Sequence, residues 1–301
     1  MDMSFDPPVG VAETLGDGVR RVLAPNPSPM TFRGTNTYLI GTREVAVIDP
    51  GPARDGHLEA ILGALGPGER ISHICVTHSH VDHSPLARPL SDATGAPVLA
   101  FGPSGAGRSA IMTRLAQAGL SDAGEGIDAA FAPDQVVADG ETVAGANWSL
   151  TAIWTPGHLG NHLSFAWDGV VFTGDLVMGW ASSLVSPPDG DLTDFMASCR
   201  RLRERGGRVF HAGHGAPIED PMARLDWLIE HRLSREAAIL GALERGPATT
   251  SDLAAAIYTD TPAALIPAAK RNILAHLVDL HMKNRVAPVG DLTETAAFQR
   301  T

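Results

Sequence analysis

The chain has 301 residues, of which 44% are hydrophobic and 19% charged, so it can bury the core of one or two domains and is not a disordered chain. Its 34 acidic residues outnumber 23 basic ones, and the formal net charge of -11 argues against a protein that coats nucleic acids or anionic membranes. No apolar run approaches the roughly 18 residues of a membrane span, and the N-terminus lacks the features of a secretory signal. We therefore expect a cytoplasmic protein without a membrane partner.

The first part of the chain alternates β-rich runs with a helix. Residues 37–41 and 45–48 predict strands, and residues 71–77 predict a strand apolar enough to be buried on both faces. Between them, residues 57–65 carry apolar side chains at helical spacing. Strand, helix and strand in this order form a βαβ unit, which indicates an α/β fold.

The middle of the chain continues this pattern. A Gly/Ser-rich stretch, residues 102–126, surrounds an expected helix at 111–118, and a second helix is expected at 192–205. The strands expected here are 135–137, 148–154, 163–167 and 170–173.

From about residue 225 the chain becomes mostly helical. Helices are expected at 228–243, at 251–257 with Thr250 or Ser251 as N-cap, and at 267–282, with a β-wing at 285–288. This is the pattern of a winged helix-turn-helix. We therefore expect a catalytic domain over residues 1–224 and a winged-helix-like domain over 225–301. The second domain has 8 basic and 9 acidic residues, which favours packing or homodimerisation over DNA binding.

Four side chains that can bind a metal ion lie within six residues, directly after the strand at 71–77. They are His78, His80, Asp82 and His83. Neutral imidazoles and carboxylates are ligands of zinc, iron and manganese, so this density indicates a metal site. The loop supplies two neighbouring half-sites, which need further ligands from other strand ends.

Three later residues can supply these ligands, namely His158, Asp175 and His214. They follow the predicted strands 148–154 and 170–173 and a further strand expected at 209–210, and each comes after a small residue at which the backbone can turn. Seven ligands suit two ions with room for solvent, whereas structural zinc prefers closed, Cys-rich cages. The two cysteines, Cys75 and Cys199, are expected to be buried thiols. His162 and His211 lie beside candidate ligands, and support of the site or plain packing both remain open. No role is assigned to the remaining isolated histidines, which are His57, His73, His231, His276 and His281.

In these residues the chain resembles the metallo-β-lactamase superfamily, whose signature is a His-x-His-x-Asp-His block followed by a single His, a single Asp and a last His. Residues 26–31 and 34–41, together with the helical tail, are similar to the lactamase-beta-2-like branch, which carries a C-terminal winged-helix domain. The resemblance implies an αββα sandwich of two mixed sheets between helical layers, followed by the small helical domain.

The resemblance also implies roles for individual residues. Asp49 matches an aspartate that supports the ligands by hydrogen bonding. Many relatives have a glycine pair after the block, whereas this chain has Ser84-Pro85, which we expect to begin a helix with Ser84 as N-cap. The antibiotic-degrading subgroup is disfavoured because neither cysteine occupies its metal-binding position. Two metal ions are implied, one on His78, His80 and His158 and one on Asp82, His83 and His214, with Asp175 bridging.

These features predict a dinuclear zinc hydrolase with a metal-bridging hydroxide, with iron or manganese as alternative metals. Two cations lower the pKa of a shared water from ~15.7 towards ~7. Asp82, which can take a proton from that water, and the bridging Asp175 are the predicted catalytic residues. The expected substrate is a small ester, thioester or lactone. The loop 182–191 is expected to overhang the metals, with Trp180 and Leu184 as an apolar wall.

Three alternatives remain. A single-stranded RNA endonuclease would need a local basic patch, for which the candidates are Arg33, Arg88, Arg108 and Arg114. A sulfur dioxygenase with one iron keeps the same ligands. A regulator that binds DNA through the winged helix is disfavoured by the charge balance of the tail.

Overall fold

The computed structural model describes residues 4–16, 18–120 and 126–301. The first three residues, used above for the expected lack of a signal, and residues 121–125 of the Gly/Ser-rich stretch lie outside the described part. The elements in chain order are β1 Ala12–Gly16, β2 Val19–Leu23, β3 Asn36–Ile40, β4 Glu44–Ile48, α1 His57–Gly63, β5 Arg70–Cys75, α2 Ala87–Thr94, β6 Val98–Ala100, α3 Ala110–Gln117, β7 Gln135–Val136, β8 Thr142–Ala144, β9 Ser149–Trp154, β10 Leu163–Trp167, β11 Val170–Gly174, α4 Leu192–Arg205, β12 Val209–Ala212, α5 Pro221–Leu243, α6 Thr250–Ile257, η1 Ala263–Leu265, α7 Ile266–Met282, β13 Val286–Pro288 and β14 Phe298–Arg300.

The strands of the first domain form two mixed sheets. The seven-stranded sheet follows chain order from β1 to β7, with antiparallel pairs up to β4 and parallel pairs from β4 to β7. The parallel pairing of β4 with β5 across α1 is the predicted βαβ unit. The five-stranded sheet has the order β12-β11-β10-β9-β8, and its one parallel pair joins β11 to β12.

The two sheets enclose a core and are covered by helices on their outer faces. Tyr38 and Ile48 from the first sheet pack against Phe165 and Phe172 from the second. Helices α1 and α2 pack on the outer face of the first sheet, and α4 and α5 on that of the second. This is the expected αββα sandwich, and burial of these apolar faces is the main force that stabilises it.

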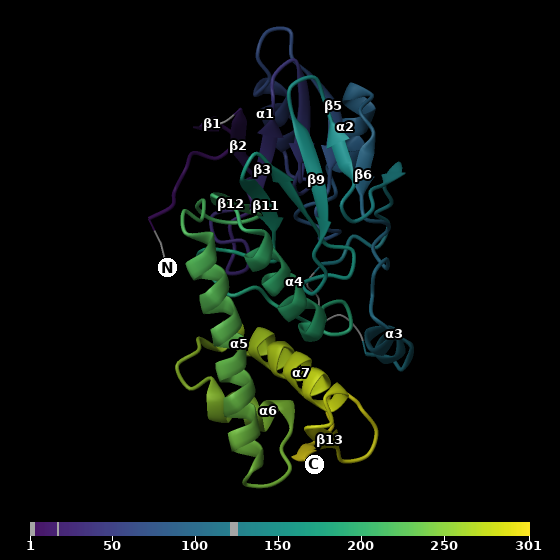
Figure 1. Ribbon diagram of the computed structural model, residues 1–301, viewed down its shortest axis with the longest axis vertical. Coiled ribbons are helices and arrows are strands. Elements are labelled where there is room, and N and C mark those ends of the chain that lie inside the picture. Colours follow the sequence, from purple (N-terminus) through teal and green to yellow (C-terminus); the bar gives the residue numbers. More distant parts are fainter. Residues whose placement is uncertain (1–3, 17, 121–125) are drawn as a thin grey trace.

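The C-terminal helices and the β13–β14 hairpin form a smaller second body, at the lower end of Figure 1. Helix α5 joins the two bodies, because its Leu225 and Leu228 belong to the core under the second sheet whereas Ile239 and Leu243 belong to the C-terminal core. The expected domain boundary after residue 224 stays a prediction, and it falls inside this helix.

Helices α3 and α7 begin one residue before their expected starts, and three other helix starts differ in their cap or by more residues. The N-cap of α6 is Thr249, neither Thr250 nor Ser251, because its side chain accepts a hydrogen bond from the Asp252 amide in a capping box. Ser84 does not cap α2, which begins three residues later; its hydroxyl donates instead to Asp128. Helix α5 begins at Pro221, seven residues before its expected start, with Asp220 as N-cap.

Both cysteines are buried free thiols, as expected. None of the helices in the described part combines the length and apolar character that a membrane-crossing segment requires.

Candidate metal centre

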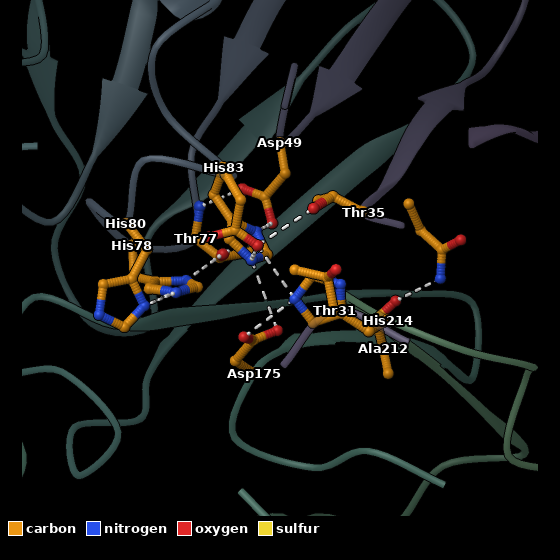
Figure 2. Close-up of polar contacts among 12 residues, drawn as sticks. Thr31, Thr35, Asp49, Thr77, His78, His80, His83, Asp175, Ala212 and His214 are labelled. Atoms are coloured by element: carbon orange, nitrogen blue, oxygen red, sulfur yellow. Dashed lines mark hydrogen bonds and ion pairs between the residues drawn. The ribbon is translucent and has the colours of Figure 1, made fainter. Parts of the chain in front are cut away.

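The seven predicted ligands converge at the ends of strands from both sheets. His78 and His80 follow β5, His158 follows β9, Asp175 follows β11 and His214 follows β12. Their ligand atoms form two groups, and within each group these atoms lie no more than 4.8 Å apart. The first group is His78, His80, His158 and Asp175, and the second is Asp82, His83 and His214. Figure 2 shows members of both groups around one centre.

In the first group three imidazole nitrogens face one another. His78 Nε2 and His158 Nε2 lie 2.9 and 3.1 Å from His80 Nδ1. The other nitrogen of His158 donates to the Leu184 carbonyl at 2.8 Å, so Nε2 carries the lone pair. The Thr77 hydroxyl donates to a carboxylate and therefore accepts from His78 Nδ1, which leaves a lone pair on Nε2 of His78 as well. Lone pairs that converge on one point fit a bound cation.

The second group combines imidazoles with carboxylates. His214 Nδ1 donates to the Gly34 carbonyl, and its Nε2 lies 3.2 Å from one carboxylate oxygen of Asp82 and 3.2 Å from one of Asp175. His83 Nε2 lies 3.4 and 3.5 Å from oxygens of the same two carboxylates. Two carboxylates that face each other's imidazole partners in a largely buried site require nearby positive charge, which a divalent cation can supply.

The pKa values of the histidines differ between the two ligand groups. Burial lowers the pKa of His80 to about 3 and that of His78 well below its usual value, so both stay neutral as ligands must. Burial also lowers the pKa of His214, but the nearby carboxylates of Asp175 and Asp82 outweigh it and raise this pKa to about 10. Without a cation, protons on imidazole therefore balance the carboxylates, and a metal ion would displace them.

The supporting role that the resemblance implies for Asp49 matches its contacts. Its carboxylate accepts from His83 Nδ1 at 2.9 Å and from the amide and hydroxyl of Thr77, each at 2.7 Å. Asp49 has a φ of 51°, in the left-handed region that residues with a Cβ adopt only where the surroundings enforce it. This one side chain thus orients a ligand of each group.

The sequence analysis did not identify the residues at the start of β3 whose hydrogen bonds support the candidate ligands. The Asn36 side chain donates to the carbonyls of Ala212 and Gly215, on both sides of His214, and the Tyr38 hydroxyl donates to Ala212. The Thr35 hydroxyl donates to Asp82 at 3.1 Å. The available signal was a polar run, residues 35–37, at the start of a strand that is otherwise apolar.

Of the two histidines left open, His162 supports a ligand. Its Nε2 accepts from the backbone amide of Asp175 at 3.2 Å, and its Nδ1 lies 3.0 Å from the Thr155 hydroxyl. The His211 ring packs on Tyr38 and Phe172, with centroids 5.4 Å from each.

The glycine before His158 is required by close approach as well as by a turn. Gly157 has a φ of 138°, and a Cβ there would lie 2.2 Å from the Cα of Phe195 in α4. Similarly, a Cβ on Gly213 would lie 2.3 Å from Oδ1 of Asp175. Because glycine has no Cβ, the backbone at both positions can approach these neighbouring atoms, and this close approach brings the candidate ligands together.

A cavity of about 790 Å³ opens onto the two groups. Metal-site residues form its base, the segment 25–31 one side, and η1 and α7 of the second body another. Leu184 lines it, as expected. Trp180 lines an adjoining cavity and stacks on Phe32 with ring centroids 5.1 Å apart.

Comparison with known proteins agrees with this geometry. Residues 30–214 match the model of the metallo-beta-lactamase superfamily. The chain belongs to this superfamily. Residues 249–295 match the beta-lactamase associated winged helix domain. The chain is thus a metallo-beta-lactamase superfamily hydrolase with a His/Asp metal site and a C-terminal winged-helix domain.

Three superfamily relatives match over most of their length. A beta-lactamase-like protein 2 homolog of Caenorhabditis elegans is 30% identical over 87% of this chain and 83% of its own. An atrochrysone carboxyl ACP thioesterase of Aspergillus fumigatus is 30% identical over 92% of this chain and 84% of its own. The crystal structure of a metallo-beta-lactamase family protein from Thermus thermophilus superposes with a TM-score of 0.74 at 25% identity, over 96% of this chain and all of that one.

Proposed function

We propose that this hydrolase binds two zinc ions and cleaves acyl thioesters of small-molecule size. The observation that carries the proposal is the pair of ligand groups, joined by Asp175, at the base of a 790 Å³ cavity. A cavity of this size takes a small molecule. The name of the thioesterase relative supports the choice of a thioester over an ester or a lactone.

The ligand assignment follows the two groups. His78, His80 and His158 would hold the first ion and Asp82, His83 and His214 the second, and Asp175 lies within reach of both groups. When bound, two such ions supply hydroxide from water near neutral pH and polarise the carbonyl of the substrate. The donor set also suits iron and manganese, so the choice of zinc needs a direct measurement.

Three side chains at the proposed metal site have different roles. The Asp82 side chain is 20% exposed and lines the cavity, so its carboxylate can accept a proton from the attacking water. The Thr35 hydroxyl, which donates to Oδ2 of Asp82, fixes the direction of that carboxylate. Asp175, held by the contact of its amide with His162, keeps the two ligand groups together.

Cleavage of RNA is the less favoured candidate. Of the four arginines considered for a basic patch, Arg33, Arg88 and Arg108 each pair with a carboxylate, of Asp6, Asp134 and Asp189 respectively. Together with the net charge of -11, these pairs leave little attraction for a polyanion.

The experiment combines metal analysis with a substrate comparison. Protein purified without added metal is analysed for zinc, iron and manganese, and the zinc-loaded enzyme is then incubated with acyl thioesters and with labelled single-stranded RNA. We expect about two zinc ions per chain and thioester cleavage, with His78→Ala lowering the rate at least about 100-fold. His231→Ala, on α5 and outside both ligand groups, is the matched control.

Two results would overturn the proposal. Cleavage of RNA alone, lost in His78→Ala, would identify a nuclease. One iron per chain, with oxygen consumed in the presence of a persulfide, would identify a dioxygenase.

A further inference from the structure

The cavity at the metal site continues into a second cavity on its apolar side. The second cavity measures about 220 Å³ and reaches Trp180 and Tyr258. Both cavities are lined by Pro29, Met30, Met178, Leu184, Leu265 and Ala268. Because these residues are shared and all apolar, the two spaces adjoin along an apolar passage.

This passage begins at the metal ligands. Leu184 lies in it, and the carbonyl of the same residue accepts the hydrogen bond that orients His158. Met178 is buried and lies three residues after Asp175 in the chain. A carbonyl group at the metal site would therefore have an apolar surface directly beside it.

The far wall of the passage belongs to the winged-helix domain and is firmly attached. Asn272 Oδ1 accepts from the Val185 amide at 3.2 Å, and Arg271 donates to Ser186 Oγ at 2.9 Å. These contacts tie α7 to the loop 182–191, so the walls of the passage that these two elements form are held together by hydrogen bonds. An apolar space that is formed in advance binds an apolar group at little ordering cost.

We propose that this passage is the acyl-binding site and that the enzyme acts on thioesters of medium to long, apolar acyl groups. The acyl chain runs from the metal site past Met178, Leu184 and Ala268 towards Trp180 and Tyr258. The inference rests on the proposed thioesterase function and deepens it by naming the substrate class. It also assigns the winged-helix domain a part in selecting the substrate.

The first test is the dependence of kcat/KM on acyl length, measured with straight-chain acyl thioesters of N-acetylcysteamine. Each methylene buried in the passage should raise kcat/KM about fourfold, which corresponds to about 0.8 kcal/mol, until the chain fills the second cavity. Equal kcat/KM for acetyl and decanoyl thioesters would overturn the acyl site and leave the thioesterase function standing.

The second test narrows the passage. Ala268→Phe places a ring where the two cavities meet and should lower the ratio of decanoyl to acetyl kcat/KM at least tenfold. The matched control is Ala237→Phe, the same change on the exposed side of α5 and away from both cavities. Thermal unfolding of both variants checks their folding, and Ala268→Leu provides a milder version with a smaller expected loss.

A binding measurement separates the two proposals. S-decyl-N-acetylcysteamine, a thioether that cannot be hydrolysed, should bind at least tenfold more tightly than its S-ethyl analogue by calorimetry, and Ala268→Phe should remove the difference. If no thioester is hydrolysed but this preference is present, the thioesterase function fails and the apolar site stands. If the decyl and ethyl probes bind equally, the acyl site is wrong whatever the enzyme hydrolyses.

Discussion

The imidazoles of the metal centre are oriented through the nitrogen that faces away from it. His158 and His214 donate to the carbonyls of Leu184 and Gly34, and His83 donates to Asp49. Such partners fix the ring angle and the nitrogen that faces the site, so the inward nitrogens are already aimed at the metal position before a metal binds.

Asp49→Asn tests this orientation. The amide keeps the shape but presents a donor or a neutral acceptor to His83 and Thr77, where the carboxylate accepts from both. We expect metal affinity or activity to fall about 10- to 100-fold with little change in fold. Metal content after dialysis against a chelator measures the effect, and Asp55→Asn, an exposed aspartate nearby, should match the wild type.

A second substitution tests the close approach beside His158. Gly157→Ala should lower the free energy of unfolding by at least about 2 kcal/mol, because the new Cβ overlaps the backbone of Phe195 and φ is positive. Gly241→Ala lies in α5 with nothing within 4 Å of the new methyl group and should instead stabilise the helix by about 0.5–1 kcal/mol. Urea denaturation compares the two, and equal effects would contradict this account.

Helix α5 is joined to the loop 182–191 and to α7 by one buried cation. The Arg232 guanidinium donates to Asn272 Oδ1 at 2.9 Å and to the Ser183 carbonyl, and it lies 5.1 Å from the Phe195 ring centroid. Burial lowers the pKa of Arg232 to about 10, so the group stays charged at neutral pH.

Removal of this cation should loosen the loop and the helices together. Arg232→Ala leaves the Ser183 carbonyl buried without its donor and should lower the free energy of unfolding by about 2–4 kcal/mol. Arg245→Ala removes an exposed arginine two residues after the end of α5 and should change it by less than about 0.5 kcal/mol. Chemical denaturation checks both values, and limited proteolysis should show faster cleavage within the loop 182–191 only in Arg232→Ala.

The two bodies of the molecule share a core as well as a cavity. Ala275 of α7 packs in the cluster that also holds Leu225, Leu228 and residues of α4. On an adjoining face of α7, Leu274 and Val278 pack in a cluster with Met112 and Leu115 of α3. Helix α7 therefore has apolar contacts with the first domain on two adjoining faces, and Figure 1 shows it between α5 and α3.

This shared core predicts that the two domains unfold together. Calorimetry should give a single transition whose van't Hoff and calorimetric enthalpies agree, because loss of either body exposes the apolar surface of the other. Two separate transitions would show that the contacts of α7 contribute little to stability.

The sequence predicted element bounds most accurately for segments whose secondary structure is determined by neighbouring residues in the chain. Residues 163–167 coincide with β10, and residues 192–205 with α4, because hydrophobic periodicity and turn residues report directly on such segments. The cap of α6 and the start of α5 were wrong by one and seven residues, since several neighbouring polar residues can cap a helix and only geometry selects one.

The candidate metal ligands could be identified from their order along the chain, because ligand chemistry depends on residue type and strand ends in an α/β fold lie at one edge. Their support by Asn36, the contact of His162 with Asp175 and the apolar passage beneath α7 join residues far apart in the chain. Such contacts leave no periodic trace in the sequence, since they depend on how whole elements pack in three dimensions. For that reason a metal site could be predicted before the structure was known, whereas the space that we propose as the acyl-binding site became visible only once α7 had its place against the loop 182–191.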